Sequence, residues 1–336
     1  MWCCPECFGD RWLSREIIPF KSSQTKTCSY CGSENQPLVA PSELRNNFEL
    51  LVNIYTEDDS GKFLVEWFKE DWALFPSLDI ANSKQLLSDI LDDGEIVRKK
   101  FVPSALCDTD RLHTWEQLKQ ELMHENRFFP TTQFNEDRLT ELLSQLLLDS
   151  GEFTELWNRA RIQKEAGPFP VDEMGAPPKR LATQGRANPA GIPYLYLAST
   201  PETAVSEIRP HTGELASVAS FKLKGNLKFI DLRDPKVSVS PFILGDESEV
   251  ALLRGDIEFL VRLGFELTRP VLPHVAAIDY IPSQYLCEYI KKCGYHGVIY
   301  KSSVSDGINL ALFDPNNANI LNVTNYKISK VSVSIQ

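Results

Sequence analysis

Apolar positions in the first half of the chain recur at the spacing of amphipathic helices. The helix-start pattern Pro41-Ser42-Glu43-Leu44 precedes apolar residues that keep a helical period to Leu51. The pattern predicts a second helix over 114–129 and a third after Asn135, a residue type that favours helix caps. The third helix carries one apolar stripe, which is more typical of a core than of a ligand pocket: Leu139, Leu142, Leu143, Leu146 and Leu147.

Strand-like segments replace this helical pattern beyond residue 150. A stretch rich in glycine and proline over 167–178 separates the two patterns, and segments 218–223 and 228–232 are then rich in strand-forming residues. We therefore expect an α+β protein, in which a helical region over 41–150 precedes a mixed α/β domain over 151–336.

Composition and charge restrict the possible classes of protein. With 336 residues, 43% of them apolar, the chain can bury a core in about two domains. Its apolar runs are shorter than the ~18 residues of a membrane span, and its first residues resemble no secretion signal, which favours a cytoplasmic protein. A net charge of −11 argues against nucleic acid as a partner. Between 179 and 236, however, nine Lys or Arg outnumber five acids, which suits a small anionic ligand or simply a solvated surface.

Two cysteine pairs near the N-terminus have the spacing of a zinc ribbon, which we place over 1–40. Cys4-x2-Cys7 and Cys28-x2-Cys31 each form a tight turn that aims two thiolates at one tetrahedral ion. Cys3 is a spare thiol that could replace Cys4, and the sequence does not choose between these neighbours. Unliganded thiols or a disulfide are the alternatives, the second disfavoured without a secretion signal. We expect structural zinc, since four thiolates leave no open position for substrate.

Polar residues in the second half have the character of a ligand site. Arg186 offers a planar fork of donors suited to a diphosphate, and Gly185 allows close approach of the backbone, although a surface arginine is the simpler interpretation. Tyr196 shares one strand face with Tyr194, where it could present its ring to a ligand or fill the core. Glu207 follows a helix start at Thr200 and Pro201, a place where a carboxylate is most often solvated.

Other catalytic motifs are excluded by their context. No histidine completes a Ser-His-acid set, and the chain contains no Gly-x-Gly-x-x-Gly or phosphate-loop signature. An Arg-x4-His spacing over 269–274 matches a ribonuclease motif that works from a helix. Two prolines within it prevent a helix, so we interpret it as chance.

In this order and spacing the polar segments resemble the RES-domain family, from about Phe153 to the C-terminus. The matching pieces are Gly-Arg-Ala-Asn at 185–188, Tyr-Leu-Ala from Tyr196, Thr-Ala-Val-Ser-Glu ending at Glu207, Ile-Asp-Leu from Ile230, Tyr-Ile-Pro-Ser-Gln from Tyr280 and Gly-Val-Ile-Tyr-Lys-Ser-Ser from Gly297, followed by Asn309 and Phe313. The first half resembles the HEPN/RES N-terminal domain found fused to such modules, through Cys-Pro-Glu-Cys-Phe-Gly-Asp, Cys-Ser-Tyr-Cys-Gly and Asp-Trp-Ala-Leu-Phe at 71–75.

The resemblance implies an ADP-ribosyltransferase-like fold that binds NAD and cleaves its nicotinamide glycosidic bond, with water or phosphate as the attacking group. Members commonly act as toxins that deplete NAD and are held in check by an antitoxin protein, so the resemblance implies a toxin of a toxin–antitoxin or phage-defence system. Carried over to this chain, the implied catalytic residues are Arg186, Tyr196, Glu207 and Ser302. The implied NAD-binding residues are Arg186, Asn188, Tyr196, Ser302 and Ser303.

These residue types suit that chemistry. Cleavage passes through a cation-like state, and nicotinamide leaves without protonation because departure neutralises its ring, so the site must mainly position groups and stabilise charge. Arg186 would bind the diphosphate, and a tyrosine ring would face nicotinamide. Glu207 would stabilise the developing cation, and Ser302 would place a hydroxyl near phosphate or ribose. Two alternatives stay open: transfer of ADP-ribose to a protein acceptor, and a zinc-ribbon interaction protein with a catalytically silent site.

Overall fold

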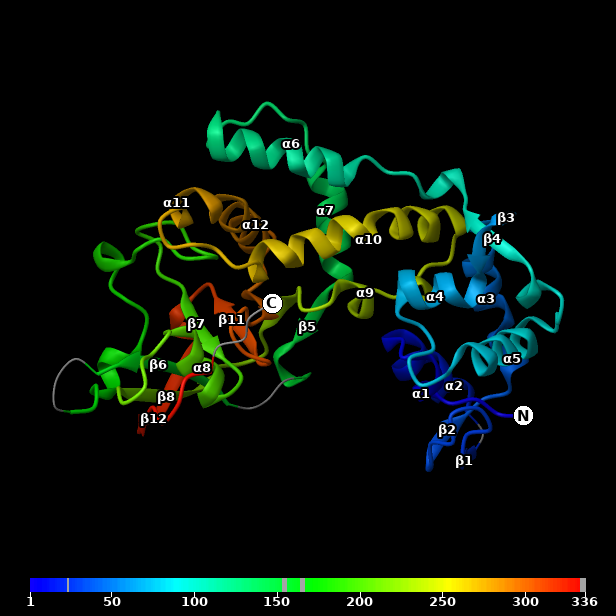
Figure 1. The fold of residues 1–336 in the computed structure, drawn as a ribbon, viewed down its shortest axis with the longest axis horizontal. Coiled ribbons are helices and arrows are strands. Elements are labelled where there is room, and N and C mark those ends of the chain that lie inside the picture. The colour runs from blue at the N-terminus through cyan, green and yellow to red at the C-terminus, as the bar shows by residue number, and fades with distance from the viewer. Residues whose placement is uncertain (23, 153–155, 164–166, 333–336) are drawn as a thin grey trace. The chain divides into compact units, whose positions relative to one another are not determined.

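A computed structural model describes residues 1–22, 24–152, 156–163 and 167–332. The chain divides into two compact units, one formed by residues 1–113 with 234–261 and the other by residues 114–233 with 262–336. The chain passes between the units within the helices α6 (Arg111–His124) and α10 (Glu247–Thr268), which Figure 1 labels, and also between Arg233 and Asp234. The predicted domain boundaries at 40 and 150 stay predictions, and Phe153, where the family resemblance starts, lies outside the described residues.

The first unit combines short helices with two small two-stranded antiparallel sheets. One of them is a hairpin of residues 24–26 and 36–38, which follows the first cysteine pair and encloses the second, and Cys3 pairs with Val39 next to it. The core of this unit is aromatic, since the ring of Phe48 contacts those of Phe8, Phe75 and Phe242. Its elements are α1 (Pro5–Phe8), α2 (Ile18–Lys21), β1 (Gln24–Lys26), β2 (Gln36–Leu38), α3 (Arg45–Val52), β3 (Tyr55–Phe63), α4 (Leu64–Trp72), α5 (Ile80–Leu91), β4 (Lys100–Pro103) and α9 (Pro235–Ser238).

The second unit is built on a mixed sheet whose strands, within the described residues, follow the order β12-β8-β6-β7-β11-β10-β9-β5. Strand β10 runs parallel to β9, and the other neighbours are antiparallel. The elements are α7 (Glu136–Gln145), β5 (Leu147–Asp149), β6 (Trp157–Ile162), β7 (Leu195–Ala198), α8 (Pro201–Glu207), β8 (Leu215–Leu223), β9 (Lys228–Asp231), α11 (Ala276–Asp279), α12 (Ile281–Lys292), β10 (Gly297–Lys301), β11 (Ile308–Leu312) and β12 (Ala318–Lys327).

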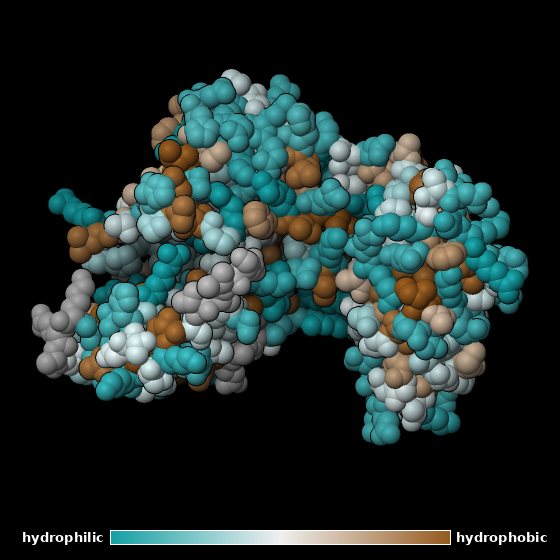
Figure 2. All heavy atoms as spheres, in the orientation of Figure 1, coloured by the Kyte–Doolittle hydropathy of each residue, from teal (hydrophilic) through white to brown (hydrophobic). Residues whose placement is uncertain are grey.

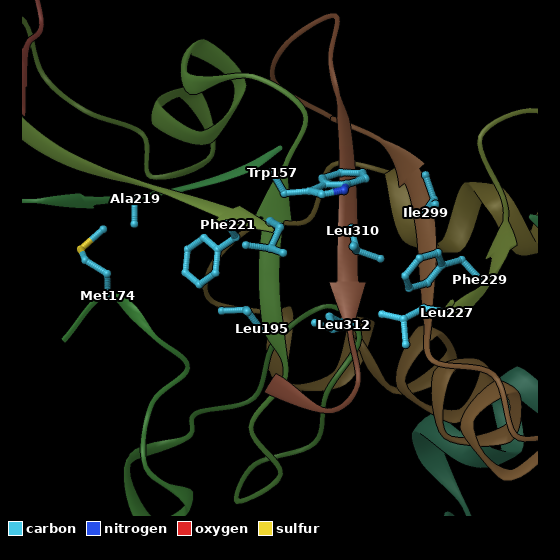
Figure 3. Close-up of a cluster of buried hydrophobic side chains, with 11 residues drawn as sticks. Trp157, Met174, Leu195, Ala219, Phe221, Leu227, Phe229, Ile299, Leu310 and Leu312 are labelled. Carbon is cyan, nitrogen blue, oxygen red and sulfur yellow. The ribbon is translucent and has the colours of Figure 1, made fainter. Parts of the chain in front are cut away.

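The two faces of this sheet bury different kinds of side chain. One face carries the apolar core in which Trp157, Leu195 and Leu310 pack together, as Figure 3 shows. Because side chains alternate along a strand, the residues next to these point to the opposite face. There, small residues such as Ala160 and Ala198 make room for the short helix α8. The small side chains therefore leave space for a pocket beside α8.

Local sequence signals predicted several of these elements. The 3-10 turn Pro41–Leu44 leads into α3, and the Asn135 side chain caps α7 by accepting from the backbone N–H of Arg138, both as predicted. The α+β class is confirmed. The helix predicted over 114–129 is instead α6, Arg111–His124, because the chain turns at Asn126, whose backbone N–H bonds back to the carbonyl of Glu121.

Polar side chains cover most of the visible surface in Figure 2, and apolar residues appear between them in small patches. Among the helices of the described ranges, none combines the length and apolar character that crossing a membrane requires.

Candidate active site

A cavity of about 260 Å³ opens on the α8 face of the sheet. The strands β6, β7, β10 and β11 form its floor, and α8 forms one wall. Six of its eleven lining residues have polar side chains, so the cavity offers several hydrogen-bonding groups among apolar ones. The lining residues are Asn158, Arg159, Ala160, Tyr196, Leu197, Ala198, Ala204, Glu207, Ile208, Tyr300 and Asn309.

Glu207 is placed at this cavity by the short helix α8. Thr200 caps the helix through its side chain, which accepts from the backbone N–H of Thr203, and Pro201 occupies the first turn, as the sequence predicted. Glu207 is the last helical residue. One of its carboxylate oxygens, Oε1, accepts hydrogen bonds from Ser302 Oγ and Asn309 Nδ2, each at 2.6 Å. The carboxylate is thus held by donors from the β10–β11 hairpin.

The same hairpin also holds the start of α8. Ser305 Oγ lies 3.2 Å from Thr203 Oγ1, and the backbone at Gly307 runs so close that a Cβ there would lie 2.0 Å from this oxygen. Thr203 is buried and has little freedom to move aside. Glycine at 307 is therefore required by close packing between the hairpin and the helix.

Tyr196 joins the sheet to the turn that carries Arg186. Its hydroxyl accepts from the backbone N–H of Ala187 at 2.9 Å and donates to Asn188 Oδ1 at 2.7 Å. A Cβ on Gly185 would lie 2.6 Å from both the Tyr196 hydroxyl and Asn188 Oδ1. Glycine at 185 is thus explained by this internal contact. Asn188 is buried, and its amide donates to the backbone carbonyls of Thr183, Pro189 and Ile192.

Arg186 stands close to the pocket but does not line it. Its Nη1 donates to the carbonyl of Arg269 at 2.7 Å, and its guanidinium lies 5.4 Å from the ring centre of Tyr280. Ser283 Oγ donates to the backbone carbonyl of Arg186 at 2.5 Å. The segments 269–274 and 280–284, singled out in the sequence, therefore hold this arginine. As expected, residues 269–274 are not helical.

The two tyrosines of the pocket are neutral at physiological pH. Burial raises the pKa of both the Tyr196 and the Tyr300 hydroxyl. The charge of Glu207 raises the pKa of Tyr300 further, and the charge of Arg186 acts in the opposite direction on both tyrosines. Arg186 and Glu207 therefore both act electrostatically on the pocket.

Several lining residues were not among the predicted site residues. Tyr300 and Asn309 face each other across β10 and β11, and β-strand alternation could have linked them once the pairing register was known. Asn158 faces Ala198 across β6 and β7. Arg159 borders the cavity, but its guanidinium donates to the carbonyl of Gly175 at 2.8 Å, and burial lowers its pKa to about 10. Ser303, a predicted ligand contact, is exposed.

The sulfur atoms of the four predicted zinc ligands, Cys4, Cys7, Cys28 and Cys31, all lie within 4.8 Å of one another. The sulfur–sulfur distance is 3.3 Å between Cys7 and Cys28, 3.4 Å between Cys4 and Cys31, and 4.0 Å between Cys4 and Cys7. Zinc–sulfur bonds of about 2.3 Å would place the sulfurs of a tetrahedral site about 3.8 Å apart. The donor set therefore fits zinc. Cys3 lies outside the group, since its thiol donates to the carbonyl of Val39 at 3.5 Å.

A mixed sheet with a pocket beside a short capped helix defines an α+β protein. The family model described as RES domain matches residues 156–329, just over half of the chain. The chain belongs to the RES domain family. It is also similar to a chain of the M. tuberculosis MbcT–MbcA toxin–antitoxin complex, with 12% identity, a TM-score of 0.32, and coverage of 57% of this chain and 93% of that chain. No curated protein matches this chain.

Proposed function

We propose that this protein binds NAD at the pocket beside α8 and cleaves the bond between nicotinamide and ribose. The observation that carries the proposal is the Glu207 carboxylate, held by Ser302 and Asn309 at a cavity that also presents Tyr196 and Tyr300. The family resemblance supports NAD as the substrate. The cavity is smaller than the ~300–1,000 Å³ typical of ligand pockets, so it suits one end of a dinucleotide.

In the proposed reaction the C–N glycosidic bond breaks, and its electron pair moves to the ring nitrogen of nicotinamide. The positive charge passes from the ring to the ribose, where the ionised Glu207 stabilises it. Water or phosphate then bonds to the ribose carbon and releases a proton to solvent. Arg186 is the residue that we assign to the diphosphate, with Asn188 and Tyr196 fixing its turn. Ser302, with Ser303 beside it, is assigned to the ribose or phosphate.

We further propose that NAD depletion by this protein is a toxic activity, controlled by a separate antitoxin protein. This part of the proposal rests on the family resemblance. A zinc ion on the four clustered cysteines would have a structural role, because a closed set of four thiolates leaves no position for substrate.

The test is nicotinamide release from NAD by the full-length protein, with and without phosphate, beside Glu207→Ala and Glu202→Ala. Both substitutions remove a carboxylate from α8, but only Glu207 faces the pocket. We expect Glu207→Ala to lower kcat at least ~100-fold, since a well-placed charge contributes a few kcal/mol to the transition state. Glu202→Ala should keep nearly full activity.

Either of two results would overturn the proposal. One is a folded wild-type protein that neither binds NAD in calorimetry nor releases nicotinamide. The other is equal turnover by wild type and a folded Glu207→Ala variant. Faster release with phosphate would identify phosphorolysis, and labelling of an added protein instead would favour ADP-ribose transfer.

A further inference from the structure

Asn309 is the least exposed of the groups that hold the Glu207 carboxylate. Its side chain is 6% exposed, and its Nδ2 donates to Glu207 Oε1 at 2.6 Å. Ser302 donates to the same oxygen, but it lies at the partly exposed end of the hairpin. Hydrogen bonds to ionised groups are stronger where water competes less. The amide of Asn309 therefore contributes more to fixing the carboxylate than the hydroxyl does.

Both donors bind one oxygen and leave the other available. Within the described part of the chain, Oε2 of Glu207 has no hydrogen-bond donor, whereas Oε1 has two. A carboxylate held through one oxygen keeps its orientation and can offer the second oxygen to a ligand. Oε1 therefore anchors the carboxylate of Glu207, and Oε2 can contact a ligand.

The backbone of Asn309 is itself fixed on both sides. It pairs with Tyr300 of β10 on one side and with Ala198 of β7 on the other. The hairpin that carries it is tied to the start of α8 through Ser305 and Gly307. A side chain on a central strand is held more accurately than one on a loop. The sheet therefore fixes the position of Asn309, and Asn309 in turn fixes the side chain of Glu207 at the end of α8.

We propose that Asn309 is the positioning residue of the site: it fixes Oε1 of Glu207 so that Oε2 is presented to the ribose of the substrate. This inference rests on the proposed function. It assigns Asn309 no contact with substrate, and its effect is exerted through Glu207. Loss of its amide donor disfavours the ionised carboxylate, because a hydrogen bond to the charged form stabilises that form.

The first test follows Glu207 itself and needs no turnover. Titration of ¹³C-labelled glutamate carboxyls by NMR, with the Glu207 signal assigned through Glu207→Gln, is compared between wild type, Asn309→Leu and Asn309→Asp. Arg159, Tyr196 and Tyr300 line the same cavity as Glu207, and Tyr300 also interacts electrostatically with Arg186. Burial raises the pKa of both tyrosines, and the pKa of Arg159 is about 10, so these three groups do not titrate in the acidic range in which carboxyl groups do.

We expect the midpoint of the Glu207 titration to move upward in Asn309→Leu, because the carboxylate loses a hydrogen-bond donor. It should rise further in Asn309→Asp, where a second carboxylate faces the first. Asn319→Leu, an exposed substitution on β12, should leave it unchanged. An unchanged midpoint in a folded Asn309→Leu or Asn309→Asp variant would overturn the inference.

The second test separates this inference from the proposed function. In nicotinamide release, Asn309→Leu should lower kcat about tenfold to a hundredfold with little change in KM, and it should move the acidic limb of the pH profile upward. A merely structural loss would not move that limb. If the NMR midpoint shifts but wild type releases no nicotinamide, the proposed function fails while the positioning role stands.

Discussion

The hydroxyl of Tyr196 connects two parts of the candidate site. It accepts from the backbone N–H of Ala187 and donates to Asn188, so strand β7 fixes the turn that carries Arg186. Its ring meanwhile borders the cavity. A buried hydroxyl that uses both its donor and an acceptor position needs no ligand to complete its bonding. Tyr196 therefore has a structural role that is independent of the substrate proposed for its ring.

Glu121 near the end of α6 has a similar structural role. Because its carboxylate must be ionised to fill this role, we expect the stability of the fold to fall in acid. Its carboxylate accepts from the backbone N–H groups and the hydroxyls of Thr131 and Thr132. These bonds lower the pKa of Glu121 from 4.5 to about 2. A lowered carboxyl pKa gives stability that is present above the unfolded value and lost as pH falls through the folded value. We expect this contribution to disappear between about pH 4.5 and 2.

The measurement is the free energy of unfolding against pH for wild type, Glu121→Gln and Glu125→Gln. Glu125 lies one turn further along the chain and is exposed, so its substitution is the control. Wild type should exceed Glu121→Gln in stability at pH 7 and approach it toward pH 2. A constant difference across that range would refute the role of Glu121 ionisation.

At this scale the structure brings together only part of the predicted site residues, since Arg186 does not line the cavity and Ser303 is exposed. Tyr196 and Glu207 line one cavity, and Ser302 reaches it through Glu207, in agreement with their common place in the family pattern. That Asn309 shares Glu207 with Ser302 depends on the register of β11 against β10 and β7. A pairing register is set by contacts across the sheet, which no local pattern in one strand contains.

At the scale of elements, the β10–β11 hairpin binds both ends of α8, and Gly307 makes this possible. A Cβ at 307 would lie 2.0 Å from Thr203 Oγ1 and 2.9 Å from Thr203 Cβ. We expect Gly307→Ala to lower the free energy of unfolding by ~1–3 kcal/mol, as overpacking of a close contact does. The shifted hairpin should also reduce nicotinamide release, because its donors would no longer reach Glu207 correctly.

Thermal unfolding and kcat are the readouts for this substitution. Gly151→Ala is the matched control, since a Cβ there meets open space. Adding Thr203→Ala to Gly307→Ala removes the nearest clashing atom and should restore part of both losses. Wild-type stability and turnover in Gly307→Ala would show that the hairpin and α8 are not packed as described.

Elements with local signals were predictable, and those with distant partners were not. The caps at Asn135 and Thr200 and the proline at 201 mark α7 and α8 within a few residues of sequence. In contrast, β5 joins the sheet edge next to β9, about eighty residues later in the chain. The prediction that Leu147 belongs to the helical stripe was wrong, because α7 ends at Gln145 and Leu147 begins β5, which pairs with β9.

At the scale of the molecule, the first unit draws on two separate parts of the chain. Residues 234–261 complete it, and within this segment Phe242 packs on Phe48 at a ring distance of 5.0 Å. Composition along the chain can suggest only contiguous segments. A discontinuous unit arises from side-chain packing, so the linear pattern contains no signal for it.

The cysteine cluster of the first unit gives the prediction that tests metal and stability together. A structural zinc ion binds the folded protein only, so losing one ligand removes folding free energy. We expect Cys28→Ser to lose the zinc equivalent of the wild type, measured by mass spectrometry, and to lower the free energy of unfolding by at least about 3 kcal/mol. Cys293→Ser, a half-buried thiol outside the cluster, should retain both.

Substitutions of Cys3 and Cys4 distinguish the two possible ligand sets, which differ in which of these two neighbours binds zinc. The thiol of Cys3 donates to the carbonyl of Val39, whereas the sulfur of Cys4 lies 3.4 Å from that of Cys31. Cys3→Ser should therefore keep its zinc, and Cys4→Ser should lose it. The opposite pair of results would move the ligand role to Cys3. If the wild-type protein contains no zinc and a chelator does not change its stability, the four cysteines are unliganded thiols that pack together.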